Sequence, residues 1–168
     1  ATQDMIDTIV NEAGKFASEV LAPVNQIGDE QGCTRHEDGS VTTPDGFKEA
    51  YQAYVEGGWG TLAKPEEFGG QGLPHVLAFA MEEFTATANQ AFGMYPGLTN
   101  GASAAIEAAG SQEQKETYLP KMISGEWSGT MNLTEPHCGT DLGMIRTKAE
   151  PQADGSYKIT GTKIFISA

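Results

Sequence analysis

The sequence predicts an α+β multidomain chain, with an all-α domain over residues 1–125 and the first strands of a β domain over residues 126–168. Two observations support this division. Before Gly125, apolar residues recur at helical spacing in several segments that proline and glycine separate. After Gly125, short strand-like runs alternate with turn signals, and Ala153-Asp154-Gly155 is typical of a hairpin turn. Helices followed by strands indicate an α+β architecture.

The helical domain is expected to begin with one long amphipathic helix from Gln3 to about Asp29, bent at Pro23. A polar loop over residues 32–43 is expected to follow. The next helix should start at Thr43-Pro44, because threonine is a preferred N-cap and proline suits the first helical turn. It should end at Gly57-Gly58.

Three more helices are expected before the β domain. One begins at Pro74 and ends where residues 93–97, Gly-Met-Tyr-Pro-Gly, interrupt it. An alanine-rich helix is expected over residues 98–109, and a capping box at residues 111–114 should start the last helix. Pro120 is expected to break or kink that helix.

The β domain is expected to contain four strands within this chain. The first is predicted over residues 127–133. The second and third, over residues 146–151 and 156–160, should pair as a hairpin. A fourth should begin over residues 163–167.

Composition narrows the classes of partner and compartment. The chain has 10 Lys and Arg against 23 Asp and Glu, a formal net charge of −13, which repels nucleic acids and anionic membrane surfaces. No run of about 18 apolar residues is present, so no membrane span is expected. The two cysteines, Cys33 and Cys138, suggest reduced thiols, and with no visible signal peptide they favour the cytoplasm. A start without Met and an end inside an expected strand suggest a fragment.

The residues with the clearest chemistry lie between Met131 and Asp141. Glu135 precedes a proline and therefore favours an extended backbone at the end of the expected strand. The turn Gly139-Thr140-Asp141 offers backbone N–H groups to a phosphate or another anion. Thr134 offers a hydroxyl to a flat ring lying across the strand. An isolated Gly-Thr-Asp tripeptide is more often a simple turn. The assignment of a ligand-binding loop therefore rests on the longer sequence from Leu133 to Asp141. The spacing of His, Cys and carboxylate residues predicts no metal site.

Four ordered segments resemble the signatures of the acyl-CoA dehydrogenase family. They are Pro65-Glu66-Glu67-Phe68-Gly69-Gly70-Gln71-Gly72, Leu119-Pro120 to Gly125-Glu126, Leu133-Thr134-Glu135-Pro136-His137-Cys138-Gly139-Thr140-Asp141, and Gly161-Thr162-Lys163-Ile164-Phe165-Ile166-Ser167. The resemblance covers essentially the whole chain, and residues 93–97 and 137–143 are further similar to a bacterial branch. It implies a helical domain followed by a truncated β-barrel domain.

The resemblance also implies that the loop is half of an FAD site. The implied cofactor-binding residues are Met131, Leu133, Thr134, Gly139, Thr140, Phe165, Ile166 and Ser167. Thr140 is also implied to meet the acyl-CoA substrate, and the hydroxyl of Ser167 to approach the flavin N5. Asn132 and Met144 stand where the family has smaller residues, which puts the fit at the rim of the site in doubt.

The activity implied by the resemblance is FAD-dependent α,β-dehydrogenation of an acyl-CoA thioester. A glutamate removes the α proton and the β hydride passes to the flavin. That glutamate is implied to come from a C-terminal domain outside this chain, so no catalytic residue is assigned here, and the 168-residue piece alone is expected to be inactive. The resemblance implies that an electron-transfer flavoprotein accepts the electrons and that the full-length protein is a homodimer or homotetramer. An acyl-CoA oxidase, a flavin monooxygenase and a non-enzymatic flavin-binding homologue remain alternatives.

Overall fold

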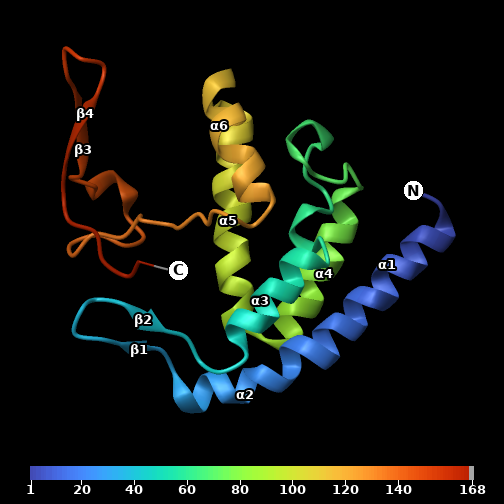
Figure 1. The fold of residues 1–168 in the computed structure, drawn as a ribbon. Coiled ribbons are helices and arrows are strands. Elements are labelled where there is room, and N and C mark those ends of the chain that lie inside the picture. The colour runs from blue at the N-terminus through green and yellow to red at the C-terminus, as the bar shows by residue number, and fades with distance from the viewer. Residues whose placement is uncertain (167–168) are drawn as a thin grey trace. The chain divides into compact units, whose positions relative to one another are not determined.

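The computed structural model describes residues 1–166 of the chain (Figure 1). It divides into a helical unit, Ala1–Gly129, and a second unit, Thr130–Ala168. The helices of the first unit are α1 (Gln3–Phe16), α2 (Ala22–Gln31), α3 (Phe47–Glu56), α4 (His75–Ala88), α5 (Gln90–Ala109) and α6 (Gln112–Ile123). They account for the helical half of the expected fold.

The first expected helix is interrupted earlier and differently than the sequence predicts. A π-helical turn, η1 (Ala17–Leu21), separates α1 from α2 and ends directly before the turn that contains Pro23. Pro23 lies in the first turn of α2, where its missing N–H is tolerated. The wider turn directly before it lets the Ala22 N–H bond to the Ala17 carbonyl, so the helix continues past the proline.

The predicted loop over residues 32–43 contains a small antiparallel pair, β1 (Thr34–Arg35) and β2 (Val41–Thr42). The next helix does not start at Thr43-Pro44, as predicted, but at Phe47 after the left-handed Gly46. A Cβ at Gly46 would lie 2.6 Å from Val24 Cγ1, so the close approach to α2 requires glycine there. Tertiary packing therefore sets this helix start.

Two prolines that were expected to end or distort helices lie inside them. Pro96 is within α5, which runs unbroken through residues 93–97, and Pro120 is within α6. Pro96 itself is buried, and Leu119 beside Pro120 is 1% exposed. The free energy gained by burying these faces exceeds the cost of the missing backbone hydrogen bond.

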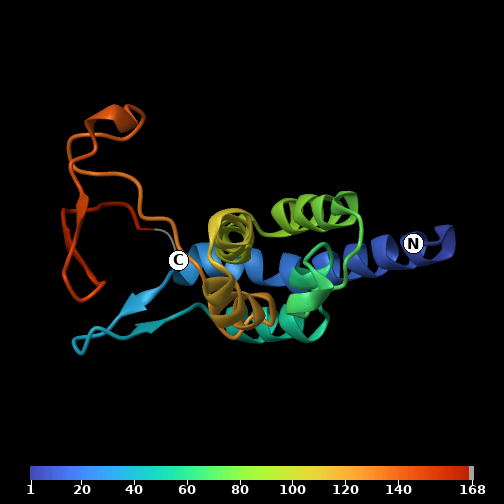
Figure 2. The same ribbon diagram turned by 90° about the horizontal axis from the view of Figure 1, so that it is seen from above.

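The helical core lies where α1 packs against α4, α4 against α5, and α5 against α6, as Figure 2 shows from above. Its buried members include Leu21 on η1, Tyr54 on α3, Met81 on α4 and Phe92 on α5. Phe68, Leu119 and Ile123 form a second, smaller cluster, against which Ile106 of α5 packs. These contacts hold α4 and α5 at a fixed spacing.

The second unit contains the hairpin that the sequence predicts. β3 (Lys148–Pro151) and β4 (Tyr157–Thr160) pair antiparallel, with Lys148 opposite Thr160. The strand predicted over residues 127–133 is not formed, and residues 163–166 of the last predicted strand are not extended, because Phe165 has a φ of 55°. Over residues 127–133 only Met131 is in a β-bridge, so no ladder of paired backbone groups forms there among the described residues. Ser167 lies outside the described residues.

Candidate functional site

The loop that carries the strongest sequence signal is closed by its own backbone. The Glu135 N–H donates to the Cys138 carbonyl at 2.9 Å, and the Cys138 N–H donates back to the Glu135 carbonyl at 3.1 Å. This reciprocal pair holds Pro136 and His137 at the tip of a tight turn. The chain then leaves the turn through Gly139.

The Glu135 carboxylate fixes this turn to two later segments. Its side chain is only 2% exposed. Its oxygens accept hydrogen bonds from the Arg146 N–H at 2.9 Å, the Thr147 N–H at 3.0 Å and the Lys163 ammonium at 2.9 Å. Lys163 also donates to the Leu133 carbonyl at 3.0 Å. Neither Glu135 nor Lys163 is among the site residues that the sequence predicts, although both lie within the segments that carry the resemblance.

These contacts shift the acidity of the carboxyl group. The Thr147 hydroxyl, the Arg146 N–H and the Lys163 ammonium hold the pKa of Glu135 well below its usual range. The Thr147 hydroxyl lies near enough to the carboxylate to lower this pKa, although it makes no hydrogen bond of full geometry within the described residues. Glu135 is therefore a charged structural group at physiological pH.

Acidification is expected to loosen this loop. Because the pKa of Glu135 is lower in the folded chain, ionisation of this group stabilises the fold above the unfolded glutamate pKa of about 4.3. That stabilisation is lost as the pH falls below this value toward the folded pKa. Thermal unfolding measured between about pH 3 and pH 7 should show a fall in midpoint at the acid end that Glu135→Gln removes. An unchanged acid dependence in the variant would contradict the assignment.

The His137 side chain belongs to the loop scaffold. Its Nε2 lies 2.9 Å from the Met144 carbonyl and 3.5 Å from a Glu135 carboxylate oxygen. Cys138 beside it is a buried free thiol. Glu135, His137 and Cys138 bring three possible metal-ligating atoms within 4.8 Å of one another, a grouping that their spacing in sequence did not predict. The Lys163 ammonium on Glu135 already neutralises the carboxylate, which argues against a cation there.

The turn after Cys138 presents its backbone outward. Gly139 and Thr140 are exposed, and within the described residues their N–H groups donate to no protein atom. The Asp141 carboxylate accepts from the Gly143 N–H at 3.1 Å and so caps the short turn η4 (Leu142–Met144). Two adjacent free N–H groups on a fixed turn fit a phosphate or carbonyl oxygen.

The structure brings some of the predicted ring-contacting residues together. The Ile164 N–H donates to the Thr134 carbonyl at 2.9 Å, which joins the two halves of the predicted site. Met131 is 55% exposed, Leu133 40%, Phe165 83% and Ile166 52%. Exposed apolar side chains beside free backbone N–H groups fit a ligand with a flat apolar ring and an anionic part, and so fit FAD. Ser167, the remaining predicted residue, lies outside the described part.

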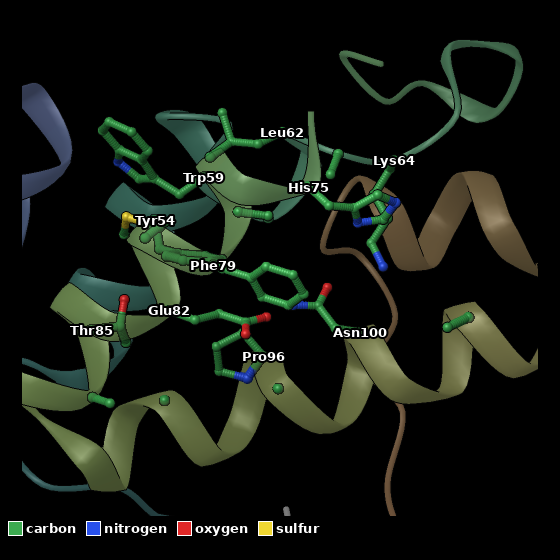
Figure 3. A pocket seen from close by; sticks show the side chains of 18 of the residues that line it. Tyr54, Trp59, Leu62, Lys64, His75, Phe79, Glu82, Thr85, Pro96 and Asn100 are labelled. Carbon is green, nitrogen blue, oxygen red and sulfur yellow. The ribbon is translucent and has the colours of Figure 1, made fainter. Parts of the chain in front are cut away.

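The helical unit contains a separate cavity of about 440 Å³ (Figure 3). It lies between α4, α5 and the segment from Tyr54 to Lys64. Its walls combine aromatic rings with a few polar side chains, which is the usual composition of a small-molecule pocket. No sequence motif marks it, because its residues come from four separated stretches of the chain.

Comparison with known proteins places these features in a family. The sequence profile described as acyl-CoA dehydrogenase, N-terminal domain, matches residues 3–126. The 3-methylmercaptopropionyl-CoA dehydrogenase of Ruegeria pomeroyi is 50% identical over 158 residues, which cover 94% of this chain and 27% of that protein.

Two solved structures share the fold. An acyl-CoA dehydrogenase complexed with FAD from Bacillus anthracis superposes with a TM-score of 0.78 at 27% identity, over 98% of this chain and 27% of that one. A chain from a study of the electron transferring flavoprotein of Acidaminococcus fermentans gives a TM-score of 0.81 at 28% identity, over 99% of this chain and 40% of that one.

The chain belongs to the acyl-CoA dehydrogenase family. The resemblance that four sequence segments indicated is thereby confirmed, and so is the expected fold of helices followed by the beginning of a β domain. The chain spans 27% of the length of the Ruegeria relative. Among the described helices, none is both long and apolar enough to cross a membrane.

Proposed function

We propose that this chain supplies part of the FAD site of an enzyme that oxidises an acyl-CoA thioester to its α,β-unsaturated form. The observation that carries the proposal is the fixed turn at Gly139 and Thr140, whose N–H groups are free beside the exposed apolar residues of the loop. Family membership and the FAD complex of the Bacillus anthracis relative support the same assignment.

In this proposal each part of the loop holds a different part of the ligands. Met131, Leu133 and Thr134 contact the flavin ring on one side, and Phe165, Ile166 and Ser167 on the other. The amides of Gly139 and Thr140 bind an oxygen of the cofactor, and Thr140 also meets the acyl-CoA. Glu135 and Lys163 bind no ligand, but they fix the loop backbone from which these contacts are made.

The bound flavin would supply the oxidising chemistry, and the residues of this chain would orient it. The base that removes the α proton is proposed to come from the part of the protein beyond this chain. The proposed acceptor of the electrons is an electron-transfer flavoprotein. The full-length protein is proposed to be a homodimer or homotetramer in the cytoplasm. Both cysteines are free thiols, which agrees with a reducing compartment.

Flavin reduction by substrate tests the activity. Purified full-length protein should be yellow, and anaerobic addition of an acyl-CoA should bleach the flavin. Slow reoxidation by oxygen, with fast reoxidation by an electron-transfer flavoprotein, is expected for a dehydrogenase. Fast reoxidation by oxygen would instead favour the oxidase or monooxygenase alternative. A protein that holds no flavin would favour the non-enzymatic alternative.

Thr134→Ala tests the proposed ring contact. Loss of one hydrogen bond to the cofactor should weaken flavin binding about tenfold or shift the flavin potential. Flavin affinity is measured by titrating the apoprotein with FAD, and the potential by reductive titration against a dye. Thr160→Ala, on the exposed strand β4, is the matched control and should leave both quantities unchanged. Wild-type affinity and turnover in Thr134→Ala would contradict the role of this hydroxyl.

A further inference from the structure

The chain leaves the helical unit through a short connector, residues 125–129, directly before the proposed flavin-contacting residues. Gly129 is the last residue of the helical unit, and Met131 follows it by two positions. Two residues of fully extended chain span at most about 7 Å. The place at which Gly129 is held on the helices therefore limits where the first proposed flavin contact can lie.

The first half of the connector is held by α3 and α6. The Tyr51 hydroxyl, on α3, donates to the Gly125 carbonyl at 3.2 Å. Two residues further on, the Trp127 N–H donates to the Lys121 carbonyl of α6 at 2.9 Å. The Lys121 ammonium also lies 4.4 Å from the centre of the Trp127 ring, a favourable cation–π contact. The connector therefore leaves α6 along a path that its own backbone contacts fix.

The second half of the connector lies directly on α5. The Gly129 N–H donates to the Thr99 hydroxyl oxygen at 3.1 Å. A Cβ built on Gly129 would lie 2.5 Å from the Ala102 Cβ and 3.3 Å from the Leu98 carbonyl oxygen. Side-chain carbons do not approach each other to 2.5 Å, so this contact requires glycine in the connector and a small residue on the helix.

Helix α5 is a well-supported base for this contact. It packs against both α4 and α6, and Figure 1 shows α6 alongside it. Thr99 is 7% exposed and Ser103 2% exposed, and the Ser103 hydroxyl donates to the Thr99 carbonyl at 2.8 Å. The Thr99 hydroxyl is therefore presented to Gly129 from a buried stretch of packed helix.

We propose that Thr99 is a positioning residue for the FAD site, acting through Gly129. Its hydroxyl holds the end of the connector against α5, and with it the start of the segment that contacts the flavin. Thr99 is not proposed to touch the cofactor itself. The inference rests on the proposed function, because it concerns the same cofactor. A residue with a purely structural role would change the stability of the helical unit without changing flavin affinity or potential.

A size exchange between the connector and α5 tests the close approach. In the full-length protein, Gly129→Ala should raise the Kd for FAD about tenfold and shift the flavin midpoint potential, because the added methyl group forces the connector away from α5. Adding Ala102→Gly removes the carbon that the new methyl group meets, so the double variant should recover most of the affinity. Ala102→Gly alone should lower the urea midpoint, since glycine weakens a helix, and affect FAD binding less than Gly129→Ala does.

Substitutions at Thr99 test the hydrogen bond separately. Thr99→Val keeps the shape of the side chain but leaves the Gly129 N–H without its acceptor, and should weaken FAD binding severalfold. Thr99→Ser retains the hydroxyl and should bind FAD within about twofold of the wild type. Titration of the apoprotein with FAD, reductive titration against a dye, and urea unfolding measure the affinity, the potential and the stability. If Gly129→Ala does not fold, the comparison of Thr99→Val with Thr99→Ser decides alone.

Two controls separate these effects from general damage to the helices. Gly14→Ala, on α1, adds the same methyl group where a Cβ meets nothing within 4 Å, and Thr117→Val removes a hydroxyl from the surface of α6. Both should leave FAD affinity unchanged.

The inference is overturned if Gly129→Ala and Thr99→Val lower only the urea midpoint and keep the wild-type FAD affinity and potential. A double variant that binds FAD no better than Gly129→Ala would also overturn it. Both results would leave the proposed function intact. If the wild-type full-length protein holds no flavin, the proposed function fails and this inference fails with it.

Discussion

Glu135→Gln is expected to weaken flavin binding on the order of 100-fold, the effect of breaking a buried ion pair that shapes a binding loop. The glutamine would place an NH₂ group where a carboxylate oxygen now accepts hydrogen bonds. At least one of the Arg146 and Thr147 N–H groups or the Lys163 ammonium would then lose its acceptor. The uncompensated ammonium beside Leu133 is the largest part of the expected loss.

Glu150→Gln is the matched control for this prediction. Glu150 pairs with Lys148 on the exposed hairpin of the same unit, at 2.7 Å, with its side chain 50% exposed. Surface ion pairs contribute little, so this variant should bind FAD as the wild type does. FAD content after purification and titration of the apoprotein measure both variants. Equal affinity in Glu135→Gln and Glu150→Gln would show that the buried carboxylate does not support the site.

Asn89→Ala should destabilise the helical unit by about 2–3 kcal/mol, the sum of a lost N-cap and a lost buried hydrogen bond. Asn89 is 1% exposed, and its side-chain oxygen accepts from the Phe92 N–H at 3.0 Å, which caps α5. Its amide group donates to the Leu21 carbonyl at 3.3 Å, at the end of the π-helical turn. One side chain therefore joins the first helical segment to the corner between α4 and α5.

Two further variants separate these contributions. Asn89→Ser keeps a capping oxygen but cannot reach Leu21 with an amide, so its stability should lie between those of the wild type and Asn89→Ala. Ser111→Ala removes the exposed N-cap of α6 alone and should cost about 1 kcal/mol. Urea unfolding followed by circular dichroism measures all three. A loss in Asn89→Ala no larger than in Ser111→Ala would mean that the Leu21 contact contributes nothing.

The sequence predicted the helical unit and the hairpin because both depend on local signals. Apolar spacing located the helices, and Ala153-Asp154-Gly155 located the turn between β3 and β4. The predictions failed where distant residues decide the outcome. Gly46 packs against Val24, and Pro96 lies within a continuous helix whose neighbouring face is buried. Rules that consider only neighbouring residues do not give the free energy of contacts between residues that are far apart in the sequence.

The candidate site shows the same limit. The motif indicated the ring-contacting and turn residues, but the carboxylate that shapes the loop was not assigned a role. Glu135 is recognised only once Lys163, 28 residues later, is seen to lie against it. The shape of the cavity in the helical unit also depends on distant residues, since its lining side chains, among them Tyr54 and Thr85, come from different helices.

The contact between Lys163 and Glu135 also affects the order in which this region can fold during synthesis. The complete signature, Leu133 to Asp141, leaves the ribosome well before Lys163 does, and until then the Glu135 carboxylate lacks its counter-charge. The turn can close through its own Glu135–Cys138 backbone pair, but neutralisation of the Glu135 charge must wait for closure of a longer segment of chain, an entropic cost that local turns avoid. A nascent chain that ended between the hairpin and Lys163 would carry every residue of the signature, yet lack the cation that holds it in shape.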